Sequence, residues 1–230
     1  MKRVLIVMSA ADTWHRTDGT DYPTGYWAEE LAAPYEQFSK AGWTVDFASP
    51  GGVLQPLDQH SADPDIAGPD CAHWVAVAEA ALRRHGPLLV LGELPPGTYD
   101  VVVLPGGHGP VVDLFQDRDL GELLVDADNR GAVIGAVCHG PAGLLSAVEP
   151  DGRWRFAGRR MAAFTNEEEH MFGTAEAAPW LLANRLREGG ATVTEGAAYQ
   201  AHIERDGNLF TGQNPASSGP MAEAIIDASS

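Results

Sequence analysis

The sequence predicts a doubly wound α/β fold, in which helices cover both faces of a mostly parallel sheet. Short apolar runs, such as residues 4–8 and 100–104, have the composition of strands that are buried on both faces. Segments with helical periodicity alternate with these runs. Turns rich in glycine and proline follow several of them, as at residues 50–52 and 105–109. Together these observations indicate one α/β domain spanning residues 1–230.

The elements can be placed in order, and no internal repeat or low-complexity linker interrupts them. Strands are expected at residues 4–8, 43–49, 100–104, 132–137 and 191–194, short strands around residue 158, and a hairpin at 202–211. Helices are expected at residues 27–40, 71–85, 117–129, 179–188 and 221–228, with a further helix after residue 141. A short edge element is expected at residues 88–96. Residues 53–96 are expected to form a small insertion or cap within the domain.

Local signals support individual elements. In the first helix, Trp27, Leu31, Tyr35 and Phe38 share one face, because they lie at i, i+4, i+8 and i+11. The segment Lys40-Ala41-Gly42 ends this helix. Near the other end of the chain, Asp206-Gly207-Asn208 is a strong hairpin turn signal.

Composition excludes several classes of partner. The formal net charge of the 230-residue chain is −17, which argues against binding to nucleic acid or to an anionic membrane surface. No apolar segment approaches the ~20 residues of a membrane-spanning helix, and the first apolar run is too short for a signal peptide. Cys71 and Cys138 are the two cysteines, too few for a disulfide framework. We therefore expect a soluble, cytoplasmic protein.

The stretch GAVIGAVCHGPAGLL, residues 131–145, contains the strongest functional signal. A strand-forming run ends at Cys138, and Gly140 and Pro141 suit a sharp turn into a helix. This is the pattern of a nucleophile elbow, which exposes a nucleophile above the end of a strand. The positive end of the following helix would favour the thiolate. The alternative is a buried structural cysteine.

Two other strand ends could supply groups to this cysteine. Gly106, Gly107 and Gly109 would let backbone N–H groups approach a ligand and form an oxyanion hole, although a plain turn would use the same residues. Glu30 lies three residues after Trp27, toward the apolar side of the first helix. A carboxyl there would have a raised pKa and could hold a proton beside a thiolate; an ordinary solvated glutamate is the alternative.

A histidine and an acid could complete the site. His139 follows the cysteine directly and could act as a base or only cap the turn. Glu168 or Glu169 could orient a histidine, or both could simply favour the start of a helix. The pair His202 and Glu204 resembles the late His-x-Glu of glutamine amidotransferases, but it continues into the predicted hairpin and is interpreted as part of a strand.

No metal site is predicted. The available ligands do not have the close, regular spacing of a zinc ribbon or an HExxH motif. The ligands considered were His15, Asp58, His60, Cys71, His73 and His108.

Four motifs in a fixed order resemble one known family. LPGGHG, AVCHGPAGLL, FTNEEE and TGQNPASS are similar to the ThiJ/PfpI superfamily, whose flavodoxin-like fold is related to that of class I glutamine amidotransferases. TGYWAEELAAPY followed by VDFASPGG resembles the branch of glyoxalase III and the heat-shock-inducible chaperones. The resemblance extends from residue 4 to the last helix.

The resemblance implies a role for individual residues. Cys138 matches the family's nucleophile, and His139 matches the histidine that is its partner. Glu169 matches the acid, with Glu168 as the alternative. Glu30 matches the glutamate that hydrogen-bonds the thiol. The positions that would surround the oxyanion or the substrate are Gly106, Gly107, His108, Asn214 and Trp27.

The implied reaction uses neither a cofactor nor a metal. The Cys138 thiolate adds to the aldehyde of methylglyoxal or a related small dicarbonyl, His139 moves a proton between the two carbons through an enediol, and water releases a 2-hydroxy acid from the thioester. Family members are usually homodimers, so a homodimer is expected. The alternatives are a stress chaperone or deglycase-like protein, a cysteine peptidase or amidase, and a redox sensor that oxidises Cys138.

Overall fold

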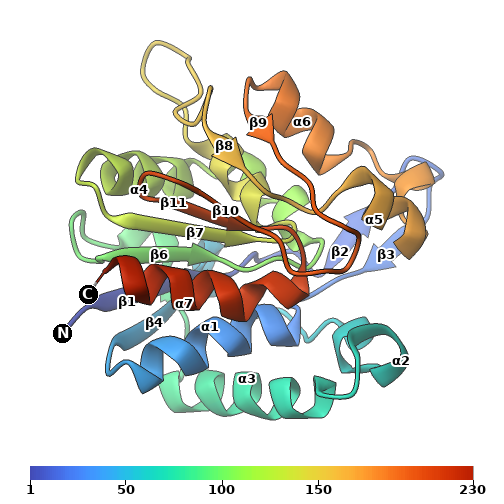
Figure 1. Cartoon of the computed structure of the whole chain (residues 1–230), viewed down its shortest axis with the longest axis horizontal. Helices are drawn as coiled ribbons and strands as arrows, with labels where there is room; N and C mark the ends of the chain where they lie inside the picture. The colour runs from blue at the N-terminus through green and yellow to red at the C-terminus, as the bar shows by residue number, and fades with distance from the viewer. Residues whose placement is uncertain (230) are drawn as a thin grey trace.

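One seven-stranded sheet forms the centre of the molecule in the computed structural model, which describes residues 1–229 (Figure 1). Its strands are β1 (Arg3–Val7), β4 (Thr44–Ser49), β5 (Leu89–Val90), β6 (Val101–Leu104), β7 (Val133–Val137), β10 (Ile203–Asp206) and β11 (Leu209–Gly212). They follow the order β10-β11-β7-β6-β1-β4-β5. All neighbours pair in parallel except β10 with β11.

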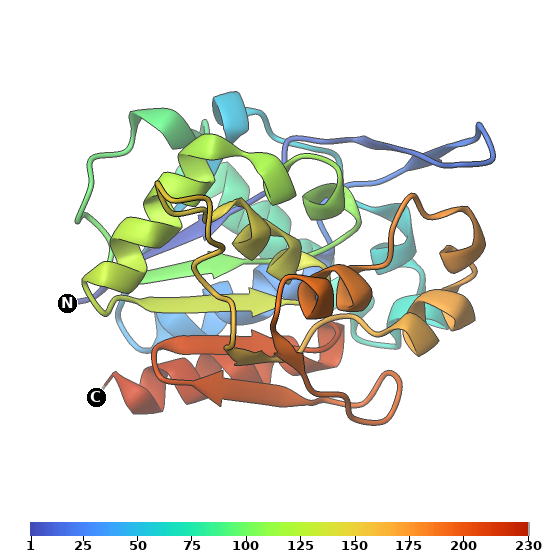
Figure 2. The ribbon, with the colours of Figure 1, turned by 90° about the horizontal axis from the view of Figure 1, so that it is seen from above.

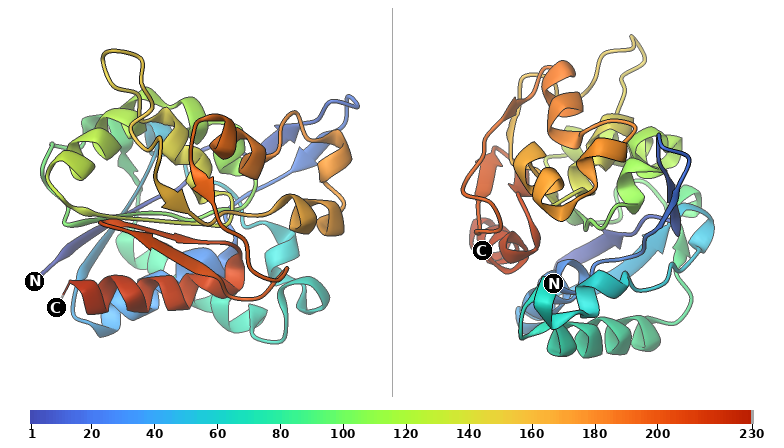
Figure 3. Two further views of the ribbon diagram at one scale, coloured as in Figure 1. Left: turned by 45° about the horizontal axis from the view of Figure 1, so that its top comes forward. Right: turned by 90° about the vertical axis from the view of Figure 1, so that its right-hand side faces the viewer.

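Helices cover both faces of this sheet, as the end-on view of Figure 3 shows. One face carries α1 (Ala28–Lys40), α3 (Cys71–His85) and α7 (Ser218–Ala228), with α1 packed between the other two. The opposite face carries α4 (Arg118–Asn129), the 3-10 helix η6 (Gly140–Ser146) and α6 (Leu182–Glu188). The predicted doubly wound, mostly parallel α/β fold is confirmed.

The remaining elements are short. The α-helices are α2 (Pro64–Ala67) and α5 (Asn166–Phe172). The 3-10 helices are η1 (Pro50–Gly52), η2 (Gln59–Ala62), η3 (Leu91–Glu93), η4 (Gly109–Val111), η5 (Leu114–Gln116), η7 (Ala175–Ala177) and η8 (Pro215–Ser217). Two small sheets pair β2 (Thr13–His15) with β3 (Asp21–Pro23) and β8 (Arg160–Met161) with β9 (Thr192–Val193).

Alternate side chains of the same strands supply two hydrophobic cores. In β1, Leu5 and Val7 belong to the core beneath α4 and η6, whereas Val4 and Ile6 belong to the core beneath α1, α3 and α7. All four are fully buried. This two-sided burial explains why the strands appear in the sequence as continuous apolar runs.

The carboxyl ends of the parallel strands meet at one edge of the sheet, away from the two chain termini (Figures 1 and 2). The β2–β3 hairpin, α2 and α5 gather around this edge. Strand order reverses at β1, which pairs with β4 on one side and β6 on the other. In open α/β sheets, ligands bind outside the carboxyl ends at such a reversal, and the candidate site described below lies here.

Two segments differ from the expectation. The segment 53–96, expected to be an insertion or cap, contributes β5 to the edge of the main sheet and α3 to a helical layer, and its α2 reaches the functional edge. The helix after the elbow is a 3-10 helix rather than an α-helix, because Gly140, Pro141 and Gly143 are poor α-helix formers. No helix of the described residues could cross a membrane.

A pair of helix glycines tests the packing beneath the elbow. A Cβ at Gly121 in α4 would lie 2.2 Å from the carbonyl oxygen of Ser146 in η6, whereas a Cβ at Gly219 in α7 would meet nothing within 4 Å. We expect Gly121→Ala to lower the free energy of unfolding by about 1–3 kcal/mol through overpacking. Gly219→Ala should leave it unchanged or raise it by up to about 1 kcal/mol. Urea unfolding measures both, and equal values would contradict this account of the packing.

Candidate active site

Cys138 stands on a sharp turn directly after β7, the position expected for an elbow nucleophile. Its φ of 60° lies in the left-handed region that favours glycine. Neighbouring backbone holds it there, because the Cys138 N–H donates to the carbonyl of Gly212 at 3.0 Å and the Phe164 N–H donates to the Cys138 carbonyl at 2.9 Å. A non-glycine residue in this region costs about 1–3 kcal/mol and persists where the surroundings impose it.

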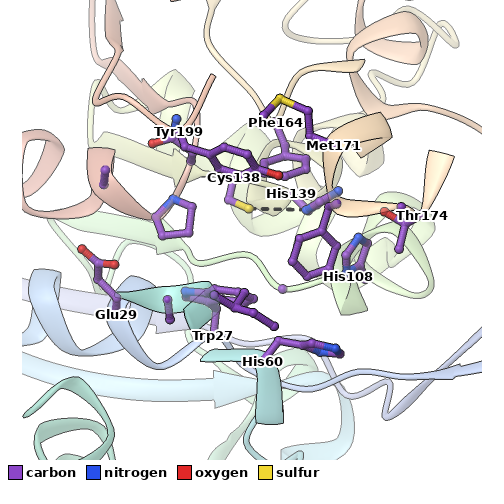
Figure 4. A pocket seen from close by; sticks show the side chains of 18 of the residues that line it. Trp27, Glu29, His60, His108, Cys138, His139, Phe164, Met171, Thr174 and Tyr199 are labelled. Atoms are coloured by element: carbon purple, nitrogen blue, oxygen red, sulfur yellow. Dashed lines mark hydrogen bonds between the residues drawn. The ribbon is translucent and has the colours of Figure 1, made fainter. Parts of the chain in front are cut away.

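His139 links the thiol to a carboxylate (Figure 4). Its Nδ1 lies 3.4 Å from Sγ of Cys138, and its Nε2 lies 2.7 Å from Oε2 of Glu169. A carboxylate accepts hydrogen bonds, so we assign the imidazole proton to Nε2. The Nδ1 lone pair then faces the thiol and can receive its proton.

Glu169 is shared by two histidines. Oε1 lies 2.9 Å from Nε2 of His108 and also accepts a hydrogen bond from the Thr174 hydroxyl. Burial acts to raise the pKa of Glu169, but His139 and His108 hold that pKa well below its ordinary value. Burial, conversely, lowers the pKa of His139, opposed mainly by Glu169. The pair is therefore a neutral imidazole beside a carboxylate.

Glu168, the alternative acid, contacts different groups. Its Oε2 accepts hydrogen bonds from the backbone and hydroxyl of Thr165 in a capping box at the start of α5. Its Oε1 accepts from the Tyr199 N–H and from the side-chain amides of Gln213 and Asn214. The structure thus places Glu169, and not Glu168, against His139.

Glu30 lies fully buried beneath the elbow, in the first turn of α1. Its Oε2 accepts a 2.6 Å hydrogen bond from the Gly106 N–H at the end of β6, and its Oε1 has no hydrogen-bond partner. Burial raises the pKa of Glu30 to about 8, against an opposing influence from Cys138 and Gly106. At neutral pH the carboxyl therefore carries a proton.

Burial also raises the pKa of the Cys138 thiol, and negative charge on Glu30 raises it further. Burial therefore outweighs the effect of the following helix, and the expected net preference for the thiolate is wrong. The side chain is buried, and the short 3-10 helix gives less dipole than an α-helix would. The His139 N–H does lower this pKa by hydrogen bonding to the sulfur. An ionised Glu30 therefore disfavours the thiolate, and a protonated Glu30 removes that effect.

Two glycines allow the loop after β6 to pack closely against neighbouring residues. A Cβ at Gly106 would lie 2.6 Å from Oε2 of Glu30 and 2.8 Å from the His139 nitrogen. A Cβ at Gly107, whose φ is 76°, would lie 2.3 Å from the carbonyl oxygen of Gly25. Only glycine fits at either position without displacing these neighbours.

The thiol opens into a cavity of about 700 Å³. Figure 4 shows Trp27 across the cavity from Cys138. In the same view His139, His108 and Thr174 lie to the right of Cys138. The predicted residues Gly107, His108, Asn214 and Trp27 all line it, whereas Gly106 lies behind the wall and holds Glu30. Asn214 also donates to Gln200 in addition to Glu168.

Several residues of the site carried no signal in the sequence. Trp14 stacks on His108 with ring centroids 4.7 Å apart, and Tyr22 contacts the same ring edge-on at 5.5 Å. Tyr199 has a φ of 57° and is the other non-glycine residue with positive φ among those described. It lines the cavity, as does Thr174. Long-range packing brings these residues together, so local periodicity could not reveal them.

Two other sequence features lie as follows. His202 and Glu204 lie on or beside β10, where both contact the Thr194 hydroxyl, and neither lines the cavity. Among the described residues, His108, His139 and Glu169 form the one cluster with metal-ligand spacing, their ligand atoms lying within 4.8 Å of one another. Hydrogen bonds between both imidazoles and the carboxylate already account for this spacing, so we propose no metal there.

The fold and this geometry define a class: a doubly wound α/β protein with a cysteine, a histidine and a glutamate at a nucleophile elbow. The chain belongs to the DJ-1/PfpI family, whose family model matches residues 24–228. This confirms the family resemblance drawn from the sequence motifs.

Similar proteins are named as glyoxalases or as a deglycase. The glutathione-independent glyoxalase HSP31 of Saccharomyces cerevisiae is 30% identical over 243 residues, which cover 99% of this chain and 98% of that protein. The crystal structure of glyoxalase III from Candida albicans matches with a TM-score of 0.82 at 26% identity, covering 99% of this chain and 97% of that chain. The protein/nucleic acid deglycase HchA of Pseudomonas aeruginosa is 27% identical, covering 96% of this chain and 79% of that protein.

The raised pKa of Glu30 predicts a pH-dependent stability. Since the folded protein holds this proton up to about pH 8 and the unfolded chain loses it near 4.5, the contribution is complete below pH 4.5 and is lost as pH rises through 8. We expect wild type to lose roughly 3–5 kcal/mol relative to Glu30→Gln between pH 4.5 and 9. Urea unfolding at a series of pH values measures the difference. Parallel curves for the two proteins would show that Glu30 is not a buried acid.

Proposed function

We propose that this protein converts methylglyoxal, or a related small dicarbonyl, to a 2-hydroxy acid without a cofactor, with Cys138 as the nucleophile. The observation that carries the proposal is the Cys138–His139–Glu169 arrangement on a glycine-lined elbow that opens into a cavity. The names of the similar proteins support the same reaction.

The first step forms a carbon–sulfur bond. His139 Nδ1 takes the thiol proton, and Glu169 stabilises the imidazolium that results. The sulfur adds to the aldehyde carbon of the substrate, giving a hemithioacetal oxyanion. The family resemblance implies backbone N–H groups near Gly107 and His139 as donors to this charge, and the oxyanion takes up a proton.

The remaining steps are an internal redox exchange and a hydrolysis. A base, His139, removes the proton from the first carbon, and the enediol that forms is protonated at the second carbon. The first carbon becomes a thioester and the second an alcohol. Water then cleaves the thioester, releasing the 2-hydroxy acid and the thiol. The net reaction is the dicarbonyl plus one water, with no external oxidant or reductant.

Glu30 has a supporting role in this scheme. As a neutral acid at pH 7, Glu30 adds no negative charge beside the thiolate. The side chain is fully buried, and its Oε1 has no hydrogen-bond partner. Ionisation of Glu30 would disfavour the thiolate. Activity should therefore fall above about pH 8.

A deglycase activity is the second candidate. The protein named as a deglycase among the similar proteins favours it, and the cavity of about 700 Å³ is much larger than methylglyoxal requires. The homodimer implied by the family resemblance and the cytoplasmic location expected from the composition stay predictions, and light scattering on the purified protein measures the oligomeric state.

The nucleophile can be tested against the second cysteine. Cys71 is also buried, but its thiol contacts the carbonyl of Ala62 at 3.4 Å and lies outside the cavity. Cys138→Ala should lower lactate formation from methylglyoxal by at least about a thousandfold, as removal of a nucleophile does elsewhere. Cys71→Ala should stay within about twofold. Turnover by Cys138→Ala at the wild-type rate would overturn the mechanism.

The two neighbouring glutamates can be separated in the same assay. Glu169→Gln removes the charge that orients His139, so we expect kcat to fall by about 10² to 10⁴ with folding retained. Glu168→Gln removes an acceptor of several buried hydrogen bonds and should chiefly lower the free energy of unfolding, by about 1–3 kcal/mol. Steady-state kinetics together with urea unfolding distinguish the two. The reverse pattern would assign the acid to Glu168.

A further inference from the structure

The cavity beside Cys138 has an unbalanced charge. Among the described residues that line it, the carboxylates are Glu29 and Asp65, and none is a lysine or an arginine. Its three histidines each have an acid partner: His60 lies 3.0 Å from Oδ1 of Asp58, and the other two share Glu169. The cavity therefore offers negative charge to a ligand and no free positive charge.

No cationic side chain among the described residues pairs with the carboxylate of Glu29 or Asp65. Neither carboxylate has an ion pair or hydrogen bond with another described residue. Figure 4 shows Glu29 beside Trp27 on the cavity wall. Burial raises the pKa of Glu29, and Asp70 adds to this effect. A bound cation would favour the ionised form of Glu29 and offset part of this cost.

Arg16 is a guanidinium close to this region, but it is already engaged. It packs over the ring of Tyr22 at 5.5 Å and lies 3.8 Å from Asp18. It is not among the residues that line the cavity. It therefore does not neutralise Glu29 or Asp65.

The walls and the volume indicate a ligand with more than three carbons. The cavity measures about 700 Å³, within the range of sites that hold drug-sized molecules. Aromatic and apolar walls are supplied by Trp27, Phe164, Phe172, Met171 and Tyr199. The Trp27 side chain is more than nine-tenths buried, and its indole N–H has no hydrogen-bond partner.

We propose that the preferred substrates are dicarbonyl compounds with a longer tail that bears a cationic group, an ammonium or a guanidinium, and that Glu29 and Asp65 select against anionic tails. This inference rests on the proposed function, because the dicarbonyl must reach Cys138. Aromatic rings also attract a cation, so the walls and the two carboxylates favour the same charge. The chemistry at the sulfur is unchanged, and the tail takes no part in bond making or breaking.

Three arylglyoxals of similar size form a matched test. They are phenylglyoxal, which is neutral, 4-carboxyphenylglyoxal, which is anionic, and 4-(trimethylammonio)phenylglyoxal, which is cationic. Each takes up one water and undergoes an internal oxidation–reduction that gives the corresponding mandelate. For each protein, kcat/KM is measured from mandelate formation, and the ratio of the cationic to the anionic substrate is compared between variants. Comparing this ratio between variants removes the difference in intrinsic reactivity of the two substrates.

The variants change one charge at a time. We expect Glu29→Gln to lower the cation-to-anion ratio by about three- to tenfold, and Glu29→Lys to lower it further, as expected for charges several ångströms apart in a partly solvated cavity. Asp65→Asn should lower it less, because Asp65 is exposed. Glu36→Gln is the control: it makes the same charge change on α1, outside the cavity, where Glu36 pairs with Lys40 at 2.9 Å. Raising the salt concentration should lower the ratio in wild type.

The outcomes separate this inference from the proposed function. If methylglyoxal and phenylglyoxal are turned over in a Cys138-dependent way but Glu29→Gln leaves the ratio where Glu36→Gln leaves it, charge selection is overturned and the proposed function stands. If methylglyoxal is turned over and no arylglyoxal is, the larger substrate class is overturned. If turnover of methylglyoxal does not depend on Cys138, the proposed function itself fails.

Discussion

The site depends on one constraint: Glu30 and Cys138 are buried together, where burial disfavours a negative charge on either group and an ionised Glu30 further disfavours the thiolate. A proton held by the carboxyl allows a thiolate above it, whereas an ionised carboxyl opposes one. The Glu30–Gly106 hydrogen bond fixes the carboxyl against the loop that follows β6. This hydrogen bond joins α1 to the loop after β6, at the point where the strand order of the sheet reverses.

A second buried carboxyl, that of Glu169, lies beside His139. The carboxylate of Glu169 accepts hydrogen bonds from two imidazoles and from a hydroxyl, and these donors stabilise its charge while His139 keeps Nδ1 toward the sulfur. The two acids of the site thus have opposite states, one neutral through burial and one ionised through its partners. The same residue type performs two functions because the surroundings differ.

Much of this could be predicted from the sequence, for identifiable reasons. Two-sided burial makes parallel strands visible as apolar runs, and the motif around Cys138 has a backbone requirement that Gly140 and Pro141 satisfy. The pairing of Glu169 with His108 could not be predicted, because 61 residues separate them and only the fold brings them together. The thiol pKa was predicted wrongly, because burial outweighed the dipole of a helix that is 3-10 in the structure.

The positive φ of Cys138 sets stability and chemistry in opposition at a single position. Glycine adopts this backbone conformation without the side-chain penalty, so a glycine there would relieve strain while removing the nucleophile. The buried Cys138 side chain also packs in the core, so its loss would offset part of that gain. The backbone at this position favours glycine, and the proposed reaction needs the thiol, so one residue is subject to two opposing demands.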